Sequence, residues 1–196
     1  MKNLMKKSIL KGVSYPAYKN LIEDLLSEGK STGKVQSSSL LNYSLSNHTR
    51  MKRLDKTIEL SKEMLAIAKE VSESQTWVVI TESWCVDAAQ TMPVIYKIAS
   101  ENDKINFTVV LRSENEELMN KFLTNGTKSI PIIIAVNSEN KVINSWGPRP
   151  SKALEMAKNH KKKYGTLDAV FKEDLGSWYA EDKGKNIQRD FALLLK

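Results

Sequence analysis

Cys85 is the residue whose type and position could do chemistry, and it is the only cysteine among 196 residues. An apolar, strand-like run over residues 77–80 precedes it, and a helix-like run begins at residue 86. We therefore expect Cys85 at a helix N-terminus, where unpaired backbone N–H groups and the helix dipole favour a thiolate. Because the thiolate is the nucleophilic form of cysteine, the position predicts a nucleophile with a lowered pKa.

Neighbouring residues limit this expectation. Asp87 and Glu82 lie close to Cys85 in sequence, and like charge disfavours a thiolate, so we expect only a small downward shift of the pKa. Neither His48 nor His160 is near, so spacing gives no Cys–His pair. A lone cysteine is often an inert, small hydrophobic residue, and that alternative stays open.

Asp87, two residues after the cysteine, has two open interpretations. Its carboxylate could accept backbone N–H bonds and cap the helix. It could instead orient a water molecule or a proton donor beside the thiol. A further alternative places Arg50 or Arg53, from a basic segment upstream, over Cys85.

Composition and charge exclude several classes of protein. The net charge is +7, but residues 76–150 carry 7 Lys or Arg against 8 Asp or Glu, so the positive excess lies outside the segment around Cys85. A nucleic-acid-binding protein is expected to carry a basic stripe with interleaved aromatic residues or a known motif, so no nucleic acid partner is expected. No apolar run approaches the ~20 residues that span a bilayer, so no membrane is expected.

The cysteine count and the first residues favour one compartment. A single cysteine cannot form an internal disulfide, and the basic start of the chain is followed by too short an apolar run for a signal peptide. We therefore expect a cytoplasmic protein in a reducing environment. No cluster of His, Cys or Asp has metal-ligand spacing, so neither a metal nor another cofactor is expected.

The rest of the pattern predicts the elements that position Cys85. Ser14 is expected to cap a helix that begins near residue 15, and apolar spacing predicts a long helix over residues 46–71. The middle of the chain predicts strand 77–80, helix 86–100, strand 106–111, helix 114–123, strands 132–136 and 142–146 joined by a hairpin, and a helix over 151–163 capped by Ser151. The tail from residue 166 is expected to be mostly helical.

These elements predict an α/β fold with a mixed sheet. A helical crossover joins the first two strands, which implies parallel neighbours, and the last two strands form an antiparallel hairpin. We expect a four-stranded sheet flanked by helices over residues 76–163. Residues 1–75 are expected to form an N-terminal helical extension, and residues 164–196 a C-terminal helical extension packed on the core.

The order of elements, with Trp84-Cys85 after the first strand, resembles the thioredoxin-like superfamily. The family's Trp-Cys-Gly-Pro-Cys motif matches Trp84-Cys85-Val86-Asp87-Ala88, and its helix-kinking proline, cis-proline and glycine after the hairpin match Pro93, Pro131 and Gly147. The resemblance covers about residues 76–160. It is closest to a bacterial group with a Trp-Cys-x-Asp-Ala-Ala signature and helical extensions.

The resemblance implies a role for each site residue. Cys85 would be the nucleophile, and Trp84 would shield one side of it. A cis-Pro131 facing the cysteine would leave the backbone of Ser129 and Ile130 free to pair with an extended peptide or with the backbone of a thiol. Asp87 would support the site in one of the two ways given above.

Two departures from the family pattern restrict the chemistry. The family's second cysteine is Ala88 here, and the buried acid six residues before the first cysteine is Val79. An internal disulfide is therefore impossible, and so is ordinary dithiol reduction of a substrate.

Two functions remain. A monothiol site could carry out thiol–disulfide exchange through a mixed disulfide at Cys85, which a low-molecular-weight thiol or a protein thiol must then release. Alternatively, the groove near Pro131 is a non-catalytic binding module for a peptide or protein partner.

Overall fold

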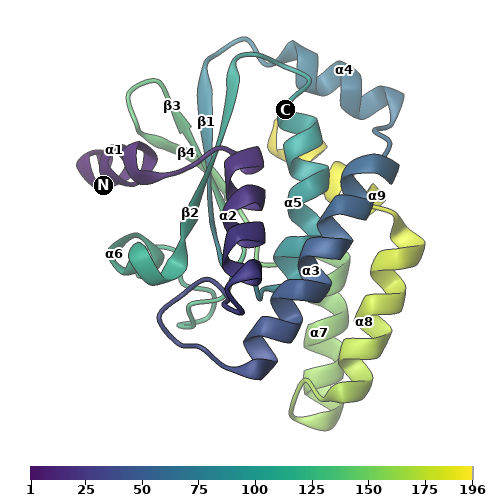
Figure 1. Ribbon diagram of the computed structural model, residues 1–196. Coiled ribbons are helices and arrows are strands. Elements are labelled where there is room, and N and C mark those ends of the chain that lie inside the picture. The colour runs from purple at the N-terminus through teal and green to yellow at the C-terminus, as the bar shows by residue number, and fades with distance from the viewer. Residues whose placement is uncertain (196) are drawn as a thin grey trace.

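The computed structural model describes residues 1–195, which form one four-stranded sheet with helices on both of its faces (Figure 1). The sheet has the order β2-β1-β3-β4, with β1 (Gln75–Thr81), β2 (Ile105–Leu111), β3 (Ile132–Asn137) and β4 (Val142–Trp146). β1 is parallel to β2 and antiparallel to β3, and β3 is antiparallel to β4. The predicted α/β class and the mixed sheet are confirmed.

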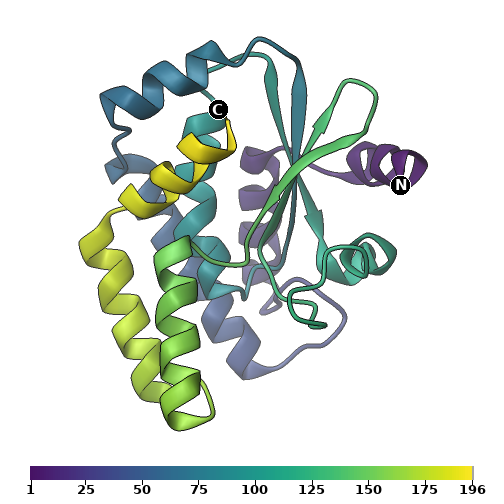
Figure 2. The same ribbon diagram turned by 180° about the vertical axis from the view of Figure 1, so that it is seen from behind.

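The helices divide between the two faces of the sheet. They are α1 (Lys2–Lys11), α2 (Tyr15–Ser27), α3 (Ser38–Thr57), α4 (Lys62–Glu70), α5 (Val86–Ala99), α6 (Glu116–Met119), α7 (Ser151–Tyr164), α8 (Ala169–Asp182) and α9 (Lys185–Leu194), with a 3-10 turn at Arg112–Glu114. In Figure 1, α1 and α6 lie on one side of the sheet and α2, α3 and α5 on the other, and Figure 2 shows the same division from behind. Within residues 1–195, no helix has the length and apolarity needed to cross a bilayer.

The N-terminal helices share one hydrophobic core with the sheet. Residues 77–80 of β1 are at most 1% exposed, because both faces of this central strand are covered. Tyr15 of α2 contacts Tyr96 of α5 and Phe107 of β2, with ring centroids 4.5 and 6.0 Å apart. The predicted Ser14 cap of α2 is confirmed, since its hydroxyl accepts the Ala17 N–H at 3.3 Å.

The long helix predicted over residues 46–71 is wrong. Its residues belong to two helices, α3 and α4, because Ile58 leaves helical geometry with a ψ of 131°. Ser61 then begins α4 by accepting the Met64 N–H at 3.1 Å, while its own N–H donates to Gln188 of α9 at 2.8 Å. Apolar spacing alone predicts one continuous helix here, but the Ser61 cap and its contact with Gln188 divide it into two.

Two other predicted helix boundaries need correction, and α1 was not predicted. The helix expected over 114–123 is reduced to α6, because the chain after Met119 continues in turns whose N–H groups bond three residues back, as Lys121 does to the Leu118 carbonyl. Ser151 is the first residue of α7 rather than its cap, and its N–H donates to Asp190 of α9 at 2.8 Å.

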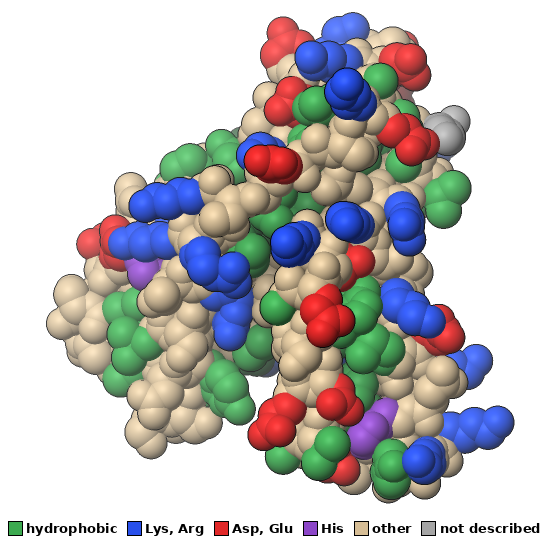
Figure 3. All heavy atoms as spheres, turned by 90° about the vertical axis from the view of Figure 1, so that its right-hand side faces the viewer, with side chains coloured by type: hydrophobic (Ala, Val, Ile, Leu, Met, Phe, Trp, Pro, Cys, Tyr) green, Lys and Arg blue, Asp and Glu red, His purple; other side chains and the backbone are tan. Residues whose placement is uncertain are grey.

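The α7–α8 pair has a small hydrophobic cluster of its own, formed by Ala153, Ala157, Phe171, Leu175 and Tyr179. Figure 3, a view from the side of the molecule, shows a cleft between this pair and the part formed by α2 and α3, with hydrophobic side chains on its walls. The α7–α8 pair therefore stands partly away from the sheet and leaves a hollow beside α3.

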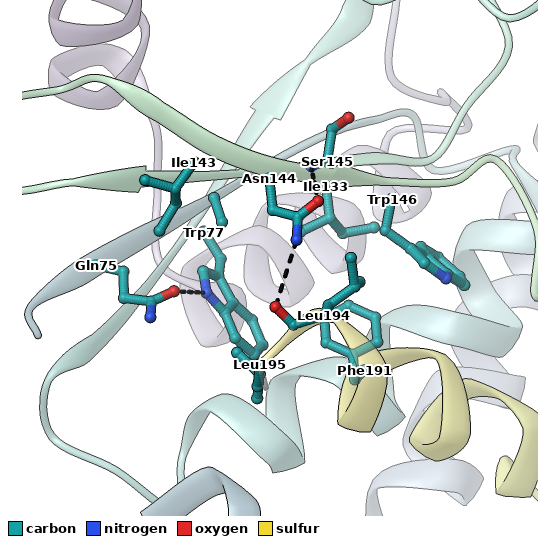
Figure 4. Close-up of a pocket in the computed structure, with 11 residues that line it drawn as sticks. Gln75, Trp77, Ile133, Ile143, Asn144, Ser145, Trp146, Phe191, Leu194 and Leu195 are labelled. Atoms are coloured by element: carbon teal, nitrogen blue, oxygen red, sulfur yellow. Dashed lines mark hydrogen bonds between the residues drawn. The ribbon is translucent and has the colours of Figure 1, made fainter. Parts of the chain in front are cut away.

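Helix α9 covers part of the sheet near the C-terminus. Phe191 lies between Trp77 and Trp146, with ring centroids 5.2 and 5.5 Å away, and the Asn144 amide donates to the Leu194 carbonyl at 3.3 Å. Figure 4 shows these side chains around a cavity of about 120 Å³ between the strands and the end of α9. The aromatic contacts anchor the end of the chain to the sheet.

Gly147, directly after β4, brings the chain against Pro131. Its φ is +126°, and a Cβ on it would lie 2.2 Å from the Pro131 carbonyl oxygen. Both the backbone conformation and the close approach exclude a side chain here.

We predict that Gly147→Ala lowers the free energy of unfolding by about 2 kcal/mol or more, because the added methyl group must displace backbone. Urea denaturation measures the loss. The matched control is Gly126→Ala, where φ is +78° and an added Cβ meets no atom within 4 Å. The control should lose only roughly 1 kcal/mol, for the left-handed conformation alone, and equal losses in the two variants would contradict the role of the close approach.

Candidate functional site: the Cys85 pocket

Cys85 connects the first turn of α5 to the segment that leads into β3. It is the N-cap residue of α5, and its sulfur accepts the Ala88 N–H at 3.4 Å. Its S–H donates to the Ile130 carbonyl at 3.3 Å. The Ile130–Pro131 peptide bond is cis. The structure therefore brings together Cys85 and the Ile130–Pro131 segment, which are distant in sequence.

The thiol is buried, and this changes its acidity. Cys85 is 7% exposed. Its pKa is raised to about 12, first by desolvation and second by the negative charge of Asp87. The N–H groups of Ala88 and Asp87 and the cation of Arg149 lower the pKa, but by less. The expected lowering of the pKa is therefore wrong, because loss of water outweighs the helix N-terminus.

The Asp87 carboxylate does not cap α5, and its alternative role, orienting a water molecule or a proton donor, stays a prediction. Its Oδ1 accepts the Tyr179 hydroxyl at 3.0 Å, and its Oδ2 forms an ion pair with Arg149 Nε at 2.8 Å. Burial is the main cause that raises the pKa of this carboxyl, and Arg149 is the main cause that opposes it. Cys85 itself caps the helix, so Asp87 instead ties α5 to α8 and to the loop after β4.

Trp84 is half-buried and lies under a guanidinium. The Arg112 side chain stacks over its ring, 4.8 Å from the centroid, and donates to the Lys128 carbonyl at 3.2 Å. Arg50 does not lie over Cys85, because it lines a neighbouring cavity and donates to Asn47 Oδ1 at 2.7 Å. The cation that acts on the thiol is Arg149.

A pocket of about 290 Å³ opens above the thiol. Its walls carry three cationic side chains and one carboxylate, and the carboxylate already pairs with Arg149. The lining residues are Trp84, Cys85, Val86, Asp87, Arg112, Lys128, Ser129, Ile130, Pro148 and Arg149. The pocket therefore favours negative charge.

The N-terminal extension holds the backbone just before the cysteine. The Ser83 hydroxyl accepts the Thr32 N–H at 3.0 Å and lies 2.7 Å from the Ser44 hydroxyl. The Ser83 N–H donates to Thr32 Oγ1 at 2.8 Å, and its carbonyl accepts the Asn47 amide at 2.8 Å. All four residues are buried, so these hydrogen bonds fix the start of the Trp84-Cys85 turn in a low-dielectric environment.

Sequence reasoning named Cys85, Trp84, Asp87, Ile130 and Pro131, which the structure places around one pocket or next to it. It missed Arg149, although the residue follows Gly147-Pro148, a break that leads back toward the cysteine. It also missed Tyr179, for which the sequence of the tail carries no signal.

Within residues 1–195, no three His, Cys, Asp or Glu side chains gather in a metal-binding arrangement.

Comparison with known proteins agrees with this geometry. A family model described as Thioredoxin matches residues 33–163, about two thirds of the chain. The chain belongs to this thioredoxin family. The family match begins before the sheet, so it includes the whole of α3 and Ser83 but not Thr32.

Solved structures show the same fold at low sequence identity. A protein of unknown function from Pseudomonas aeruginosa is 12% identical, with a TM-score of 0.60, over 93% of this chain and 97% of that one. An HIV epitope scaffold is 13% identical, with a TM-score of 0.51, over 88% of this chain and 99% of that one. No curated protein matches the sequence. The first similarity extends over the helical additions as well as the sheet.

We predict that Asp87→Asn lowers the pKa of the Cys85 thiol. The substitution removes the negative charge that is the second cause of the raised pKa, and it leaves the positive charge of Arg149 uncompensated. Absorbance of the thiolate during a pH titration measures the shift. The control is Asp174→Asn on the exposed side of α8. An unchanged or higher pKa in Asp87→Asn would contradict this electrostatic account.

Proposed function

We propose that the chain is a thioredoxin-fold binding module, in which an extended acidic segment of a protein partner occupies the Cys85 pocket. The observation that carries the proposal is the buried, neutral thiol at the base of a pocket with an excess of cations. Acidic side chains would pair with Arg112, whose hydrogen bond goes to a backbone carbonyl, and with Lys128, whose ion pair with the exposed Glu116 at 3.2 Å can be exchanged for one with the ligand.

The backbone beside the pocket supports an extended ligand. Within residues 1–195, no hydrogen bond uses the N–H of Ile130, and the Ile130 carbonyl accepts only the Cys85 thiol. A strand-like segment could pair with this backbone, since main-chain hydrogen bonds are a common source of affinity in peptide recognition.

The raised pKa makes rapid catalysis the weaker candidate. With a pKa of about 12, the thiolate fraction at neutral pH is more than about a thousandfold below that of a free cysteine. The greater nucleophilicity of a more basic thiolate recovers roughly half of this deficit on a logarithmic scale. Exchange at this sulfur would therefore be on the order of a hundredfold slower than at a free thiol.

Monothiol thiol–disulfide exchange is the second candidate, and a specific observation favours it. The N–H groups of Ala88 and Asp87 are directed to the sulfur and lower its pKa. They would stabilise the thiolate when entry of water or substrate reduces the cost of desolvation. The Cys85 thiolate would attack one sulfur of a disulfide, form a new S–S bond and release the other half as a thiolate. A low-molecular-weight thiol or a protein thiol would then free Cys85. Both candidates fit the reducing cytoplasm that we propose as the compartment.

We predict that a fluorescent peptide of alternating glutamate and valine binds the protein, and that Arg112→Gln weakens binding by about threefold to tenfold. Fluorescence anisotropy measures the affinity. The matched control is Lys121→Gln, an exposed cation outside the pocket, which should bind like the unaltered protein. Equal affinity for a glutamine–valine peptide would contradict charge recognition.

The exchange candidate makes a different prediction. Incubation with hydroxyethyl disulfide should give a mixed disulfide at Cys85, detected by mass spectrometry, and Cys85→Ser should give none. Adduct formation at or above the rate of a free thiol would favour exchange over the binding module. A rate on the order of a hundredfold lower is what the raised pKa predicts.

A further inference from the structure

A second cavity lies beside the Cys85 pocket, between α3 and α8, and we call it the α3–α8 cavity. Its volume is about 500 Å³, within the range of small-molecule sites. It corresponds to the cleft between the two parts of the molecule in Figure 3. Trp84, Val86, Asp87 and Arg149 line both spaces, so they form the partition between this cavity and the Cys85 pocket.

Most of the cavity wall is apolar. Leu40 and Tyr43 come from α3, and Phe171 and Leu175 come from α8. Tyr43 is 43% exposed, which is a large exposed fraction for an aromatic residue beside a cavity. An apolar ligand would remove this surface from water, and burial of apolar surface is the main source of affinity in such sites.

Gly176, in the middle of α8, leaves space in this cavity. It is one of the lining residues, and a Cβ added to it would meet no atom within 4 Å. Its backbone is helical, so neither positive φ nor close packing within the chain requires glycine here. Glycine weakens the interior of a helix relative to alanine. The missing side chain therefore keeps part of the cavity open.

The cavity wall carries three cationic side chains, Arg50, Arg149 and Lys172, against one carboxylate. Arg50 lines the cavity and is half-buried, and burial is the main cause that lowers its pKa. Its guanidinium donates to the neutral side chain of Asn47, which is itself 1% exposed and donates to the Ser83 carbonyl. Asp87, the carboxylate among the lining residues, is already paired with Arg149 and Tyr179. A half-buried guanidinium without a carboxylate partner is stabilised by a bound anion.

We propose that the α3–α8 cavity binds a small carboxylic acid with an apolar body. The carboxylate pairs with Arg50, and the body lies between Tyr43 of α3 and Phe171 of α8, over the space at Gly176. The proposal requires neither thiol chemistry at Cys85 nor the acidic segment proposed for the neighbouring pocket. A ligand in the α3–α8 cavity would contact Trp84 and Arg149 from the side of these residues that does not face the Cys85 pocket.

Calorimetric titration of the full chain with decanoate tests the proposal. Saturable binding is expected, and Arg50→Gln should weaken it by at least about tenfold, while Arg50→Lys, which keeps the charge, should weaken it less. Decylamine, with the same chain and the opposite charge, should not bind. An absence of saturable binding of decanoate, or equal binding of decylamine, would overturn the proposal.

Substitutions at Gly176 test the place of binding. Gly176→Phe fills the cavity and should abolish decanoate binding, whereas Gly176→Ala adds one methyl group in open space and should keep it within about threefold. Thermal unfolding by circular dichroism checks that each variant is folded. If Gly176→Phe does not fold, the Arg50→Gln titration decides the result. Unaltered decanoate binding in a folded Gly176→Phe variant would place the ligand elsewhere and contradict the proposal.

Discussion

The site depends on one sulfur that is bonded on two sides. Cys85 accepts the Ala88 N–H in the first turn of α5 and donates to the Ile130 carbonyl before β3. The cysteine therefore acts as a structural link between a helix N-terminus and the cis Ile130–Pro131 segment, as well as a candidate reacting group. Its S–H is used in this link, which is a property of the neutral thiol and not of the thiolate.

The helical extensions complete the site rather than lie apart from it. From the N-terminal side, Thr32, Ser44 and Asn47 hold Ser83, two residues before the cysteine. From the C-terminal side, Tyr179 of α8 binds Asp87. The Tyr179 hydrogen bond lowers the pKa of Asp87 and so favours its negative charge, two residues after the thiol, and that charge raises the pKa of Cys85. The same elements form walls of the neighbouring α3–α8 cavity, whereas the residues that line the Cys85 pocket all belong to the thioredoxin-like core.

The sequence was sufficient for the features that depend on local pattern. Buried β-strand runs, the hairpin before Gly147 and the strand-to-helix junction at Cys85 predict the mixed sheet and place the cysteine at a helix start. The helix predicted over 46–71 failed because Ile58 and Ser61 break it through a cap and a contact with Gln188, and apolar spacing carries no information on either.

The acidity of the thiol could not be predicted for a related reason. The helix N-terminus is local and visible in the sequence, and its N–H groups do lower the pKa. Desolvation depends on which distant residues cover the sulfur, and Arg149 and Tyr179 reach Asp87 only through the tertiary fold. The sign of the net shift is therefore a property of the packed structure.

The rate of Cys85 alkylation by iodoacetamide, followed from neutral to alkaline pH in the folded protein, tests this account most directly. A neutral, buried thiol predicts a rate on the order of a hundredfold below that of free cysteine at neutral pH, still rising well above pH ~8.5. A fast reaction that reaches its plateau below pH ~8.5 would show an exposed thiolate and contradict the account.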